Sequence, residues 1–339
     1  MSLLSVNNIS KKGLGDFWLQ EVTFSQRKNQ KIAIAGETGS GKSTLLRIIA
    51  GLEDYHSGKI LFNNEHVIGP ADNLIPGHPG IAYLTQDFEL PKFLRVAQIL
   101  QYANTLPHER ASELFKVCEI SHLLLRKADE LSGGERQRIA LTRLLISSPR
   151  LLLLDEPFSN LDMMHRIILK NVLKRICKQL DITCILVSHD PDDVLSWADE
   201  IIVLKKGIIV QKGTPKKIYS KPIDEYTAGL FGPYNLISPS QAVEFFSSWK
   251  KKPRNKLLMI RPEEIKNVRK KNSFVSGRVT NVSFFGSYYM LEIEVGKNRI
   301  LVKERKKVRE GDVVHLKCSS NYSRINSDAM SIKESIHIK

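Results

Sequence analysis

The first residues whose types and spacing could do chemistry form a glycine-rich segment near the N-terminus. They are Gly36, Glu37, Thr38, Gly39, Ser40, Gly41, Lys42, Ser43 and Thr44. This order satisfies the pattern G-x-x-x-x-G-K-[ST], in which glycines let backbone amides wrap phosphates and the following helix start adds its positive dipole end. We expect Lys42 to contact the β- and γ-phosphates and Ser43 to ligate Mg²⁺. The segment therefore predicts binding of ATP with Mg²⁺.

Two acidic residues follow an apolar run in the middle of the chain. Residues 151–154 are all leucine, and Asp155 and Glu156 come directly after them. A carboxylate at the carboxyl end of a central strand lies where open α/β sheets bind ligands, so Asp155 is expected to hold Mg²⁺ through its water shell. Glu156 is then placed to polarise the attacking water as a general base. Beside a phosphate loop, the pair indicates hydrolysis of ATP.

A second glycine-rich helix start lies between these two motifs. Its residues are Leu131, Ser132, Gly133, Gly134, Glu135, Arg136, Gln137 and Arg138. Ser132 and Glu135 form an S-x-x-E capping box, so a helix begins there with glycine amides that can approach a γ-phosphate closely. Alone, the segment would be an ordinary helix cap. Because residues 36–44 already contact one face of the phosphates, we expect it to serve the other face, on a nucleotide held by a second copy of the chain.

These motifs lie at the turns of a predicted α/β fold. We expect strands at residues 3–9, 21–24, 31–35, 151–154, 183–187 and 201–204. Apolar positions three and four apart predict helices at residues 42–50, 96–104, 109–120 and 132–146. The later strands are continuous apolar runs, which indicates strands covered on both faces and hence a largely parallel sheet.

A change of composition near residues 233–239 marks a second domain. Beyond an amphipathic piece at residues 241–249 come short alternating strands at residues 275–282, 288–295, 300–302 and 313–318. Gly277, Gly286, Gly296 and Gly311 punctuate them. Short strands with evenly spaced glycines favour a small all-β barrel. We therefore divide the chain into residues 1–235 and 236–339.

The charge of the chain is concentrated in its last third. Residues 236–339 hold 22 Lys and Arg against 10 Asp and Glu, a net of +12 within the formal +15 of the whole chain. Such a field can attract nucleic acid, anionic lipid or a small oxyanion. A solvated basic face is the favoured interpretation, because clusters such as residues 250–252 and 305–307 lie between expected strands.

Composition also bears on the compartment. No apolar run approaches the roughly 18–20 residues of a membrane-spanning helix, and residues 1–10 lack the pattern of a secretion signal. The cysteines Cys118, Cys177, Cys184 and Cys318 have no metal-ligand spacing, which suits buried thiols in a reducing compartment. We therefore expect a cytoplasmic protein.

Taken together, residues 36–44, 131–138 and 155–156 resemble the motifs of ATP-binding-cassette (ABC) ATPases. The resemblance implies an α/β P-loop NTPase core with a helical subdomain at about residues 88–147. It also implies a homodimer that sandwiches two ATP molecules, each between residues 36–44 of one chain and Ser132–Glu135 of the other.

Further positions are assigned by the same resemblance. Gln86 matches the glutamine that helps to hold Mg²⁺ and reports to a transmembrane partner, and His189 matches the switch histidine that contacts the γ-phosphate. Asp162 belongs to the loop by which each subunit senses the other's site, where Asn160 replaces the usual small residue. An aromatic residue that stacks on adenine normally precedes the phosphate loop by some two dozen residues. That register holds Gly13 and Leu14 here, so the candidates are Phe17, which we assign to ATP binding, and Trp18; either could instead pack in the sheet.

The sequence also resembles importer ATPases beyond the cassette. Residues 213–235 look like their exit segment, and residues 260–265 look like the motif that opens their appended barrel, the TOBE domain. This implies a subunit on the inner face of the cell membrane that binds permease subunits, through helices near residues 90–121, and acts indirectly with a solute-binding protein. The cargo is not readable from the sequence, since importers of polyamines, ferric iron, sulfate, molybdate and maltose use such ATPases.

Three alternatives remain open. A cassette protein of DNA repair or translation would use the basic barrel on nucleic acid, but the span from Gln86 to Leu131 is too short for an inserted coiled coil, so nucleic acid is not expected as a partner. A regulatory cassette that does not turn ATP over is disfavoured by four intact residues: Lys42, Asp155, Glu156 and His189. An exporter subunit would lack the barrel.

The aromatic turn at residues 284–289 could stack on bases, although barrel core and strand edge are favoured.

Overall fold

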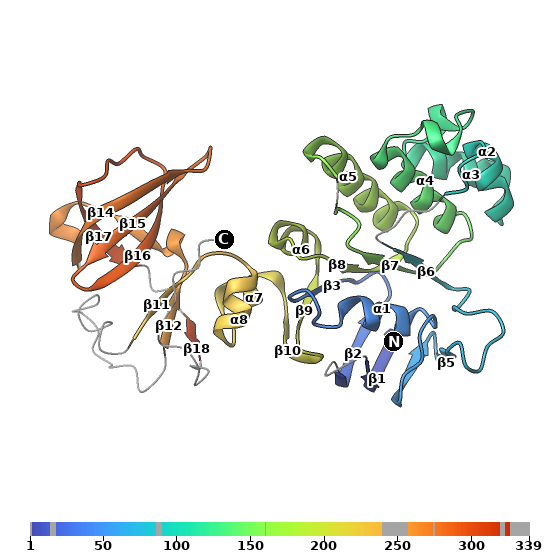
Figure 1. Ribbon diagram of the computed structural model, residues 1–339, viewed down its shortest axis with the longest axis horizontal. Coiled ribbons are helices and arrows are strands. Elements are labelled where there is room, and N and C mark those ends of the chain that lie inside the picture. Colours follow the sequence, from blue (N-terminus) through green and yellow to red (C-terminus); the bar gives the residue numbers. More distant parts are fainter. Residues whose placement is uncertain are drawn as a thin grey trace. The chain divides into compact units, whose positions relative to one another are not determined.

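The computed structural model describes residues 2–13, 18–85, 90–159, 161–238, 257–273, 275–318 and 323–325. It forms two compact units, Met1–Thr214 and Pro215–Lys339 (Figure 1). The division lies ahead of the expected boundary after residue 235. The reason is that the helices α7 (Pro215–Ser220) and α8 (Glu225–Leu230) belong to the second unit.

Arg261 attaches this helical segment to the barrel. Its guanidinium donates to the backbone oxygens of Gly232 and Pro233, at 2.8 and 3.1 Å. It also donates to the backbone oxygen of Tyr219 at 3.2 Å and stacks on the Tyr219 ring, 4.3 Å from the centroid. Ala228 of α8 packs with the buried Met259 in the same unit. The exit segment therefore folds with the barrel, although its composition resembles that of the first unit.

The first unit is built on a six-stranded sheet with the strand order β10-β9-β3-β8-β7-β6. Its strands are β3 (Lys31–Ala35), β6 (Ile81–Leu84), β7 (Leu151–Asp155), β8 (Thr183–Val187), β9 (Glu200–Lys205) and β10 (Ile208–Gly213). All neighbours pair in parallel except β10, which returns antiparallel to β9. The expected, largely parallel sheet is present, and the carboxyl ends of β3, β8 and β7 lie side by side at one edge.

A second sheet of four antiparallel strands has the order β2-β1-β4-β5. The strands are β1 (Ser2–Lys12), β2 (Trp18–Arg27), β4 (Ser57–Phe62) and β5 (Glu65–His66). The sequence pattern predicted the first two as shorter strands and missed the others. Helix α1 (Lys42–Ile49) lies between the two sheets (Figure 1).

The leucine run of β7 shows why its pattern is continuous rather than alternating. Leu151 and Leu153 pack into the core formed with α1 and the antiparallel sheet. Leu152 and Leu154 pack into a second core on the other face, formed with the helices that follow β6. Side chains alternate between the two faces of a strand, so a strand with a core on each side needs apolar residues throughout.

Helices cover that second face of the sheet (Figure 1). They are α2 (Val96–Ala103), α3 (His108–Val117), α4 (Gly133–Leu145) and α5 (Met163–Gln179), with the short 3₁₀ turns η1 (Ser121–Leu123) and η2 (Ala128–Glu130). The expected helices at residues 96–104 and 132–146 match within one residue at each end, and α3 ends earlier than expected. α6 (Pro191–Trp197) follows β8. No helix within the described ranges combines enough length and apolar character to span a bilayer.

The second unit carries an all-β domain. Its five-stranded antiparallel sheet has the order β13-β17-β14-β15-β16, and β13 and β16 at its two edges lie against each other. The strands are β13 (Ile265–Asn267), β14 (Val275–Phe284), β15 (Tyr289–Val295), β16 (Asn298–Glu304) and β17 (Val313–Cys318). A smaller sheet joins β11 (Asn235–Ile237), β12 (Leu257–Ile260) and β18 (Ser323–Ile325), and the 3₁₀ turns are η3 (Pro262–Glu264) and η4 (Lys270–Asn272).

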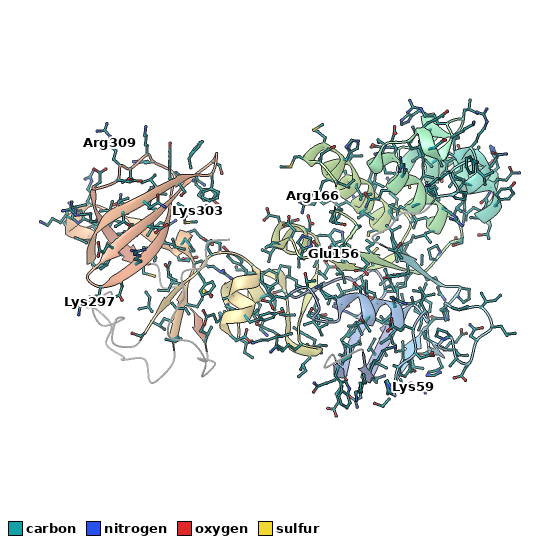
Figure 2. All side chains as sticks on the ribbon, viewed as in Figure 1. Lys59, Glu156, Arg166, Lys297, Lys303 and Arg309 are labelled. Carbon is teal, nitrogen blue, oxygen red and sulfur yellow. The ribbon has the colours of Figure 1, made fainter. Side chains whose placement is uncertain are left out.

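The apolar side chains of this domain gather inside the curled five-stranded sheet, while Lys297, Lys303 and Arg309 point outward (Figure 2). The amphipathic piece expected at residues 241–249 lies outside the described residues.

Candidate functional site

The phosphate loop joins β3 to α1 and turns at two glycines. Gly39 and Gly41 have φ values of 80° and 102°, in a region that other residues rarely adopt. Gly41 is the N-cap of α1, which begins at Lys42. Lys42 Nζ donates to the backbone oxygens of Gly36 and Glu37, both at 2.8 Å. Burial lowers the pKa of Lys42, and the charges of nearby carboxylates oppose that shift.

Two features of this loop fit a bound phosphate. A Cβ atom on Gly36 would lie 2.3 Å from the backbone oxygen of Leu204 and 2.7 Å from Ser40 Oγ, so the backbone can approach closely only with glycine there. Ser40 Oγ is buried and has no hydrogen-bond partner among the described residues, which is uncommon for a buried hydroxyl. The first amides of α1, this hydroxyl and the Lys42 ammonium can therefore bind phosphate oxygens.

Asp155 and Ser43 place two oxygen ligands side by side. Ser43 Oγ donates to Asp155 Oδ1 at 3.0 Å. The other carboxylate oxygen, Asp155 Oδ2, accepts a hydrogen bond of 2.8 Å from the Tyr83 hydroxyl. Burial, followed by the charge of Asp155 and this hydrogen bond, raises the pKa of Tyr83, so the phenol keeps its proton. A serine hydroxyl and a carboxylate are oxygen ligands of the kind that Mg²⁺ takes.

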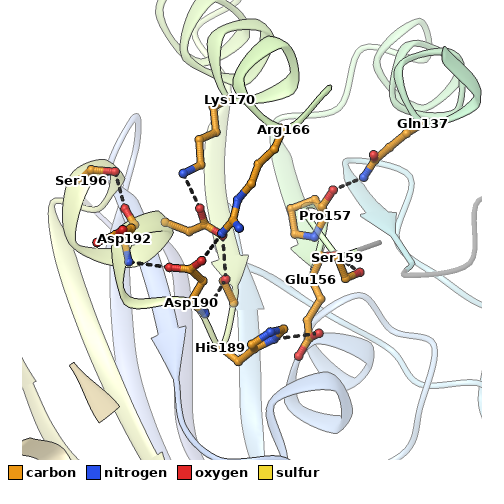
Figure 3. Close-up of polar contacts among 12 residues, drawn as sticks. Gln137, Glu156, Pro157, Ser159, Arg166, Lys170, His189, Asp190, Asp192 and Ser196 are labelled. Carbon is orange, nitrogen blue, oxygen red and sulfur yellow. Dashed lines mark hydrogen bonds and ion pairs between the residues drawn. The ribbon is translucent and has the colours of Figure 1, made fainter. Parts of the chain in front are cut away.

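Glu156 and His189 meet at the carboxyl ends of β7 and β8. Glu156 Oε2 lies 3.1 Å from His189 Nδ1 (Figure 3). Glu156 has a φ of 47°, a conformation that costs a non-glycine residue about 1–3 kcal/mol and that is common at functional sites. A hydrogen bond of 3.0 Å from Glu156 N to the backbone oxygen of Val187 holds it. The strained backbone turns this carboxylate toward the histidine rather than along the strand.

The third motif starts α4 with the expected capping box. Ser132 N donates to Glu135 Oε2 at 2.8 Å, and Glu135 N donates to Ser132 Oγ at 3.3 Å. Burial raises the pKa of Glu135, but the hydrogen bonds from Ser132 and the charge of Arg126 outweigh it and lower the pKa overall. The carboxylate therefore stays ionised at the positive end of the helix, where negative charge is favourable.

The two glycines of this motif differ. A Cβ on Gly133 would meet no atom within 4 Å, whereas a Cβ on Gly134 would lie 2.4 Å from Cδ2 of His165 in α5. Gly133 therefore faces open space, and Gly134 allows α4 to pack against α5. Gln137 Nε2 donates to the backbone oxygen of Pro157, which connects α4 to the loop that follows Glu156 (Figure 3).

Asp162 lies at the start of α5 as its N-cap. Its Oδ1 accepts a hydrogen bond of 3.0 Å from His165 N, and its Oδ2 lies 2.7 Å from His165 Nδ1. Asp162, His165 and Gly134 thus form one contact between α5 and α4. The role of Asp162 in coupling two subunits remains a prediction.

Three of the predicted positions lie outside the described residues: Gln86, Phe17 and Asn160. The other aromatic candidate, Trp18, begins β2 and is half exposed. A Cβ on Gly207 would lie 1.8 Å from the backbone oxygen of Trp18, and Gly207 N donates to the backbone oxygen of Ser40 at 3.0 Å. The backbone of Trp18 therefore lies near the phosphate loop.

Sequence reasoning brought together Lys42, Ser43, Asp155, Glu156 and His189, and the structure places them at one edge of the sheet. It missed Tyr83, and it named Gln137 within a motif but missed its contact with Pro157; the partners of these two residues are 72 and 20 positions away in the sequence. Neither residue has a local pattern that could have identified its partner.

Comparison with known families gives two matches. Residues 19–159 match the family described as ABC transporter, and residues 258–321 match the TOBE domain. The spermidine/putrescine import ATP-binding protein PotA of Clostridium acetobutylicum is 30% identical over 333 residues, which cover 93% of each chain. The PotA protein of Spiroplasma citri is 31% identical over 336 residues, covering 93% of this chain and 95% of its own.

Solved structures of ABC transporter proteins resemble about two thirds of this chain. The ADP conformation of MJ1267, an ATP-binding cassette of an ABC transporter, has a TM-score of 0.57 and 27% identity, covering 68% of this chain and 98% of its own. The cbiO1 protein of Clostridium perfringens, part of the transporter complex cbiONQ, has a TM-score of 0.57 and 29% identity over 64% of this chain and 90% of its own. With the two family matches, this confirms the expected fold class, an α/β P-loop core followed by a small all-β domain of the OB type.

Proposed function

We propose that this chain, which belongs to the ATP-binding subunits of ABC transporters of the importer type with a C-terminal TOBE domain, drives polyamine import as a homodimer. The chain is an ATPase. Its partners in this proposal are membrane permease subunits, bound from the inner face of the cell membrane, and indirectly a solute-binding protein that delivers the cargo.

The observation that carries the catalytic part is the cluster at the carboxyl ends of three adjacent strands. Lys42 of the phosphate loop, the Ser43–Asp155 pair and the Glu156–His189 pair all lie there. Lys42 binds the β- and γ-phosphates, and Ser43 with Asp155 holds Mg²⁺, which neutralises phosphate charge when bound. Gln86 is the further Mg²⁺ ligand in this scheme.

Glu156 acts as the general base in this proposal. Its carboxylate takes a proton from the water that attacks the γ-phosphorus, and His189 keeps that carboxylate oriented from the side of β8. The Glu156–His189 contact of 3.1 Å supports this division of roles, because it holds the carboxylate of the base from the end of β8.

The second wall of each ATP site comes from the partner chain. The helix start at Ser132–Glu135 is capped by the side chains of these two residues, and the space beside Gly133 is open. Both features support the approach of a γ-phosphate held by another copy. Closure of two copies over two ATP molecules and reopening after phosphate release would then drive the permease.

The helical face of the first unit offers a surface for the permease. Phe93, Tyr102 and Leu125 are exposed by 87%, 77% and 76%. The first and last lie on neighbouring segments, since Val96 N and Ala97 N donate to the backbone oxygens of residues 126 and 124. Exposed apolar groups of this kind are typical of protein interfaces.

The cargo is proposed from the relatives. Those in Clostridium acetobutylicum and Spiroplasma citri are named for spermidine/putrescine import, and they align with this chain over both units. A polyamine is therefore favoured over iron, sulfate, molybdate or maltose.

Replacing Glu156 with Gln tests the proposal in cells and in solution. Hydrolysis is expected to fall by about 10²- to 10⁴-fold, the usual contribution of a positioned general base. Uptake of labelled spermidine, lost on deletion of the chain, is expected to return with the parent or with Glu310→Gln, an exposed control on the barrel, but not with Glu156→Gln. Hydrolysis by Glu156→Gln at the parent rate would refute the mechanism, and spermidine uptake that survives the deletion would refute the cargo.

A further inference from the structure

The loop that carries His189 is held from α5 by ion pairs. Arg166 Nη2 donates to Asp190 Oδ2 and, at 2.7 Å, to Asp193 Oδ2 (Figure 3). Asp190 follows His189 directly, and Asp193 lies in the first turn of α6. One guanidinium therefore joins α5 to the loop that presents the histidine.

The residue before His189 belongs to the same network. Ser188 is buried, and its Oγ donates to Asp193 Oδ2 at 3.1 Å while accepting a hydrogen bond of 3.1 Å from Asp190 N. The side chain of Asp193 is only 1% exposed and also pairs with Lys170 Nζ at 2.5 Å. Residues 188 and 190 are thus fixed on both sides of His189, whose own side chain is 66% exposed.

The pKa values of Arg166 and Asp190 are shifted in the directions that favour their charged forms. Burial lowers the pKa of Arg166, but the hydrogen bonds and charges of Asp193 and Asp190 raise it overall. Burial raises the pKa of Asp190, and the hydrogen bond from Arg166 is the first of several contacts that lower it overall. Asp193 is the buried member of the network, with a side chain 1% exposed. Removing Arg166 would take away one of the partners of this buried charge, which is costly, so the arrangement resists displacement.

We infer that Arg166 is a positioning residue for His189: it sets the loop so that the imidazole reaches Glu156. Arg166 touches neither Glu156 nor the phosphate loop in the contacts described, so its effect on hydrolysis must pass through the loop. The inference rests on the proposed role of His189 beside the general base. Asp162, the residue that the family resemblance assigns to sensing the other subunit, is the N-cap of the same helix.

A double-mutant cycle between Arg166 and His189 tests this. In the full-length protein, Arg166→Leu is expected to lower kcat by about 10- to 100-fold, as expected for a group displaced by about 1 Å, while ATP binding stays within about threefold. Added to His189→Ala, it is expected to cause little further loss, because a residue that acts only through His189 has nothing left to position. Arg166→Lys is expected to recover part of the rate.

Two more variants keep the test decisive. Asp190→Asn removes the charge that faces Arg166 but keeps the oxygen that accepts from Asp192 N at the start of α6, so it should lower kcat even if Arg166→Leu unfolds. Arg175→Leu is the matched control, since Arg175 lies on the same helix and pairs with Glu119 instead. Its kcat is expected to match the parent.

The outcomes separate the two claims. Parent-like kcat in His189→Ala would refute the proposed role of His189, and with it the inference. The inference alone would be overturned if His189→Ala lowered kcat while Asp190→Asn and a folded Arg166→Leu both kept the parent kcat. It would also be overturned if the double variant of Arg166→Leu and His189→Ala lost kcat by the product of the two single fold-losses.

Discussion

At the scale of single residues, Asp155 is the point where the site is most tightly specified. Its two oxygens accept from different side chains, Ser43 and Tyr83. One partner lies in the phosphate loop and the other in β6, so the carboxylate is held between two elements. In our proposal Asp155 helps to hold Mg²⁺, and partners that orient such a carboxylate contribute to metal affinity.

Tyr83→Phe is expected to raise the Mg²⁺ concentration for half-maximal hydrolysis by about tenfold, the lower end of the effect of removing such a partner. The reason is that Asp155 Oδ2 loses the hydroxyl that fixes it. Titration of ATPase activity with Mg²⁺ at saturating ATP measures this. Tyr55→Phe is the control, since Tyr55 OH bonds His66 at 3.1 Å away from the site. Equal Mg²⁺ requirements for Tyr83→Phe and the parent would show that Tyr83 does not orient the ligand.

At the scale of elements, helix α4 starts with two glycines, Gly133 and Gly134, that have different surroundings. Gly134 is required by the approach of α5, because any side chain there would overlap the His165 ring. Gly133 has space around it, so packing within one chain gives no reason for glycine. Its reason must lie in something that approaches from outside, which is the nucleotide of the partner chain in our proposal.

The pair Gly133→Ala and Gly134→Ala tests this distinction. Gly134→Ala is expected to lower the midpoint of thermal unfolding, because overpacking a tight contact typically costs about 1–3 kcal/mol. Gly133→Ala is expected to leave that midpoint unchanged and to lower ATP hydrolysis. Scanning calorimetry and a steady-state ATPase assay report the two effects. Normal hydrolysis by Gly133→Ala would argue that this helix start does not meet a phosphate.

The elements also show what the sequence could and could not predict. The capping box at Ser132 and the buried strand at residues 151–154 were predictable, because each pattern is complete within a few residues. The pairing of Leu4 with Phe62, and hence the antiparallel sheet, depends on residues far apart and was missed. The contact between Arg166 and Asp190 crosses 24 positions and needs α5 and β8 in place. The division between the two units lies ahead of the predicted boundary for the same reason. Arg261 binds the backbone of Gly232 and Pro233, which lie 29 and 28 positions earlier in the sequence.

At the scale of the whole molecule, the basic charge of the barrel has a rival explanation in nucleic-acid binding. Lys303, Arg305 and Arg309 are exposed, and Lys303 Nζ lies 4.0 Å from the centroid of the Tyr288 ring. The ring of Tyr288 stacks on Phe285 with centroids 5.2 Å apart. The Tyr288 ring is thus already in contact with Lys303 and Phe285, which favours a solvated basic face, whereas Phe284 and Phe285 remain 66% and 55% exposed and leave base stacking to be tested.

A salt series on the full-length chain distinguishes these explanations. Binding to duplex and single-stranded oligonucleotides is expected to be weak and to disappear near 0.15 M salt, where exposed charges are screened beyond roughly 8 Å. A nucleic-acid protein would instead show submicromolar affinity at that salt, with a log–log slope near 0.9 per phosphate contact on duplex DNA. Fluorescence anisotropy measures both quantities. The second result would contradict the importer assignment of the barrel.

The central claim is that each ATP site is shared by two chains, and mixing two inactive variants tests it most directly. Lys42→Ala damages the phosphate loop, and Ser132→Arg damages the helix start that serves the partner. In a heterodimer of the two, one site carries both lesions and the other carries neither. We predict that each variant alone is inactive and that mixing restores about a quarter of the parent activity, the share expected for random pairing of two-fold dimers. A mixture that contains heterodimers and stays inactive would contradict two independently working shared sites.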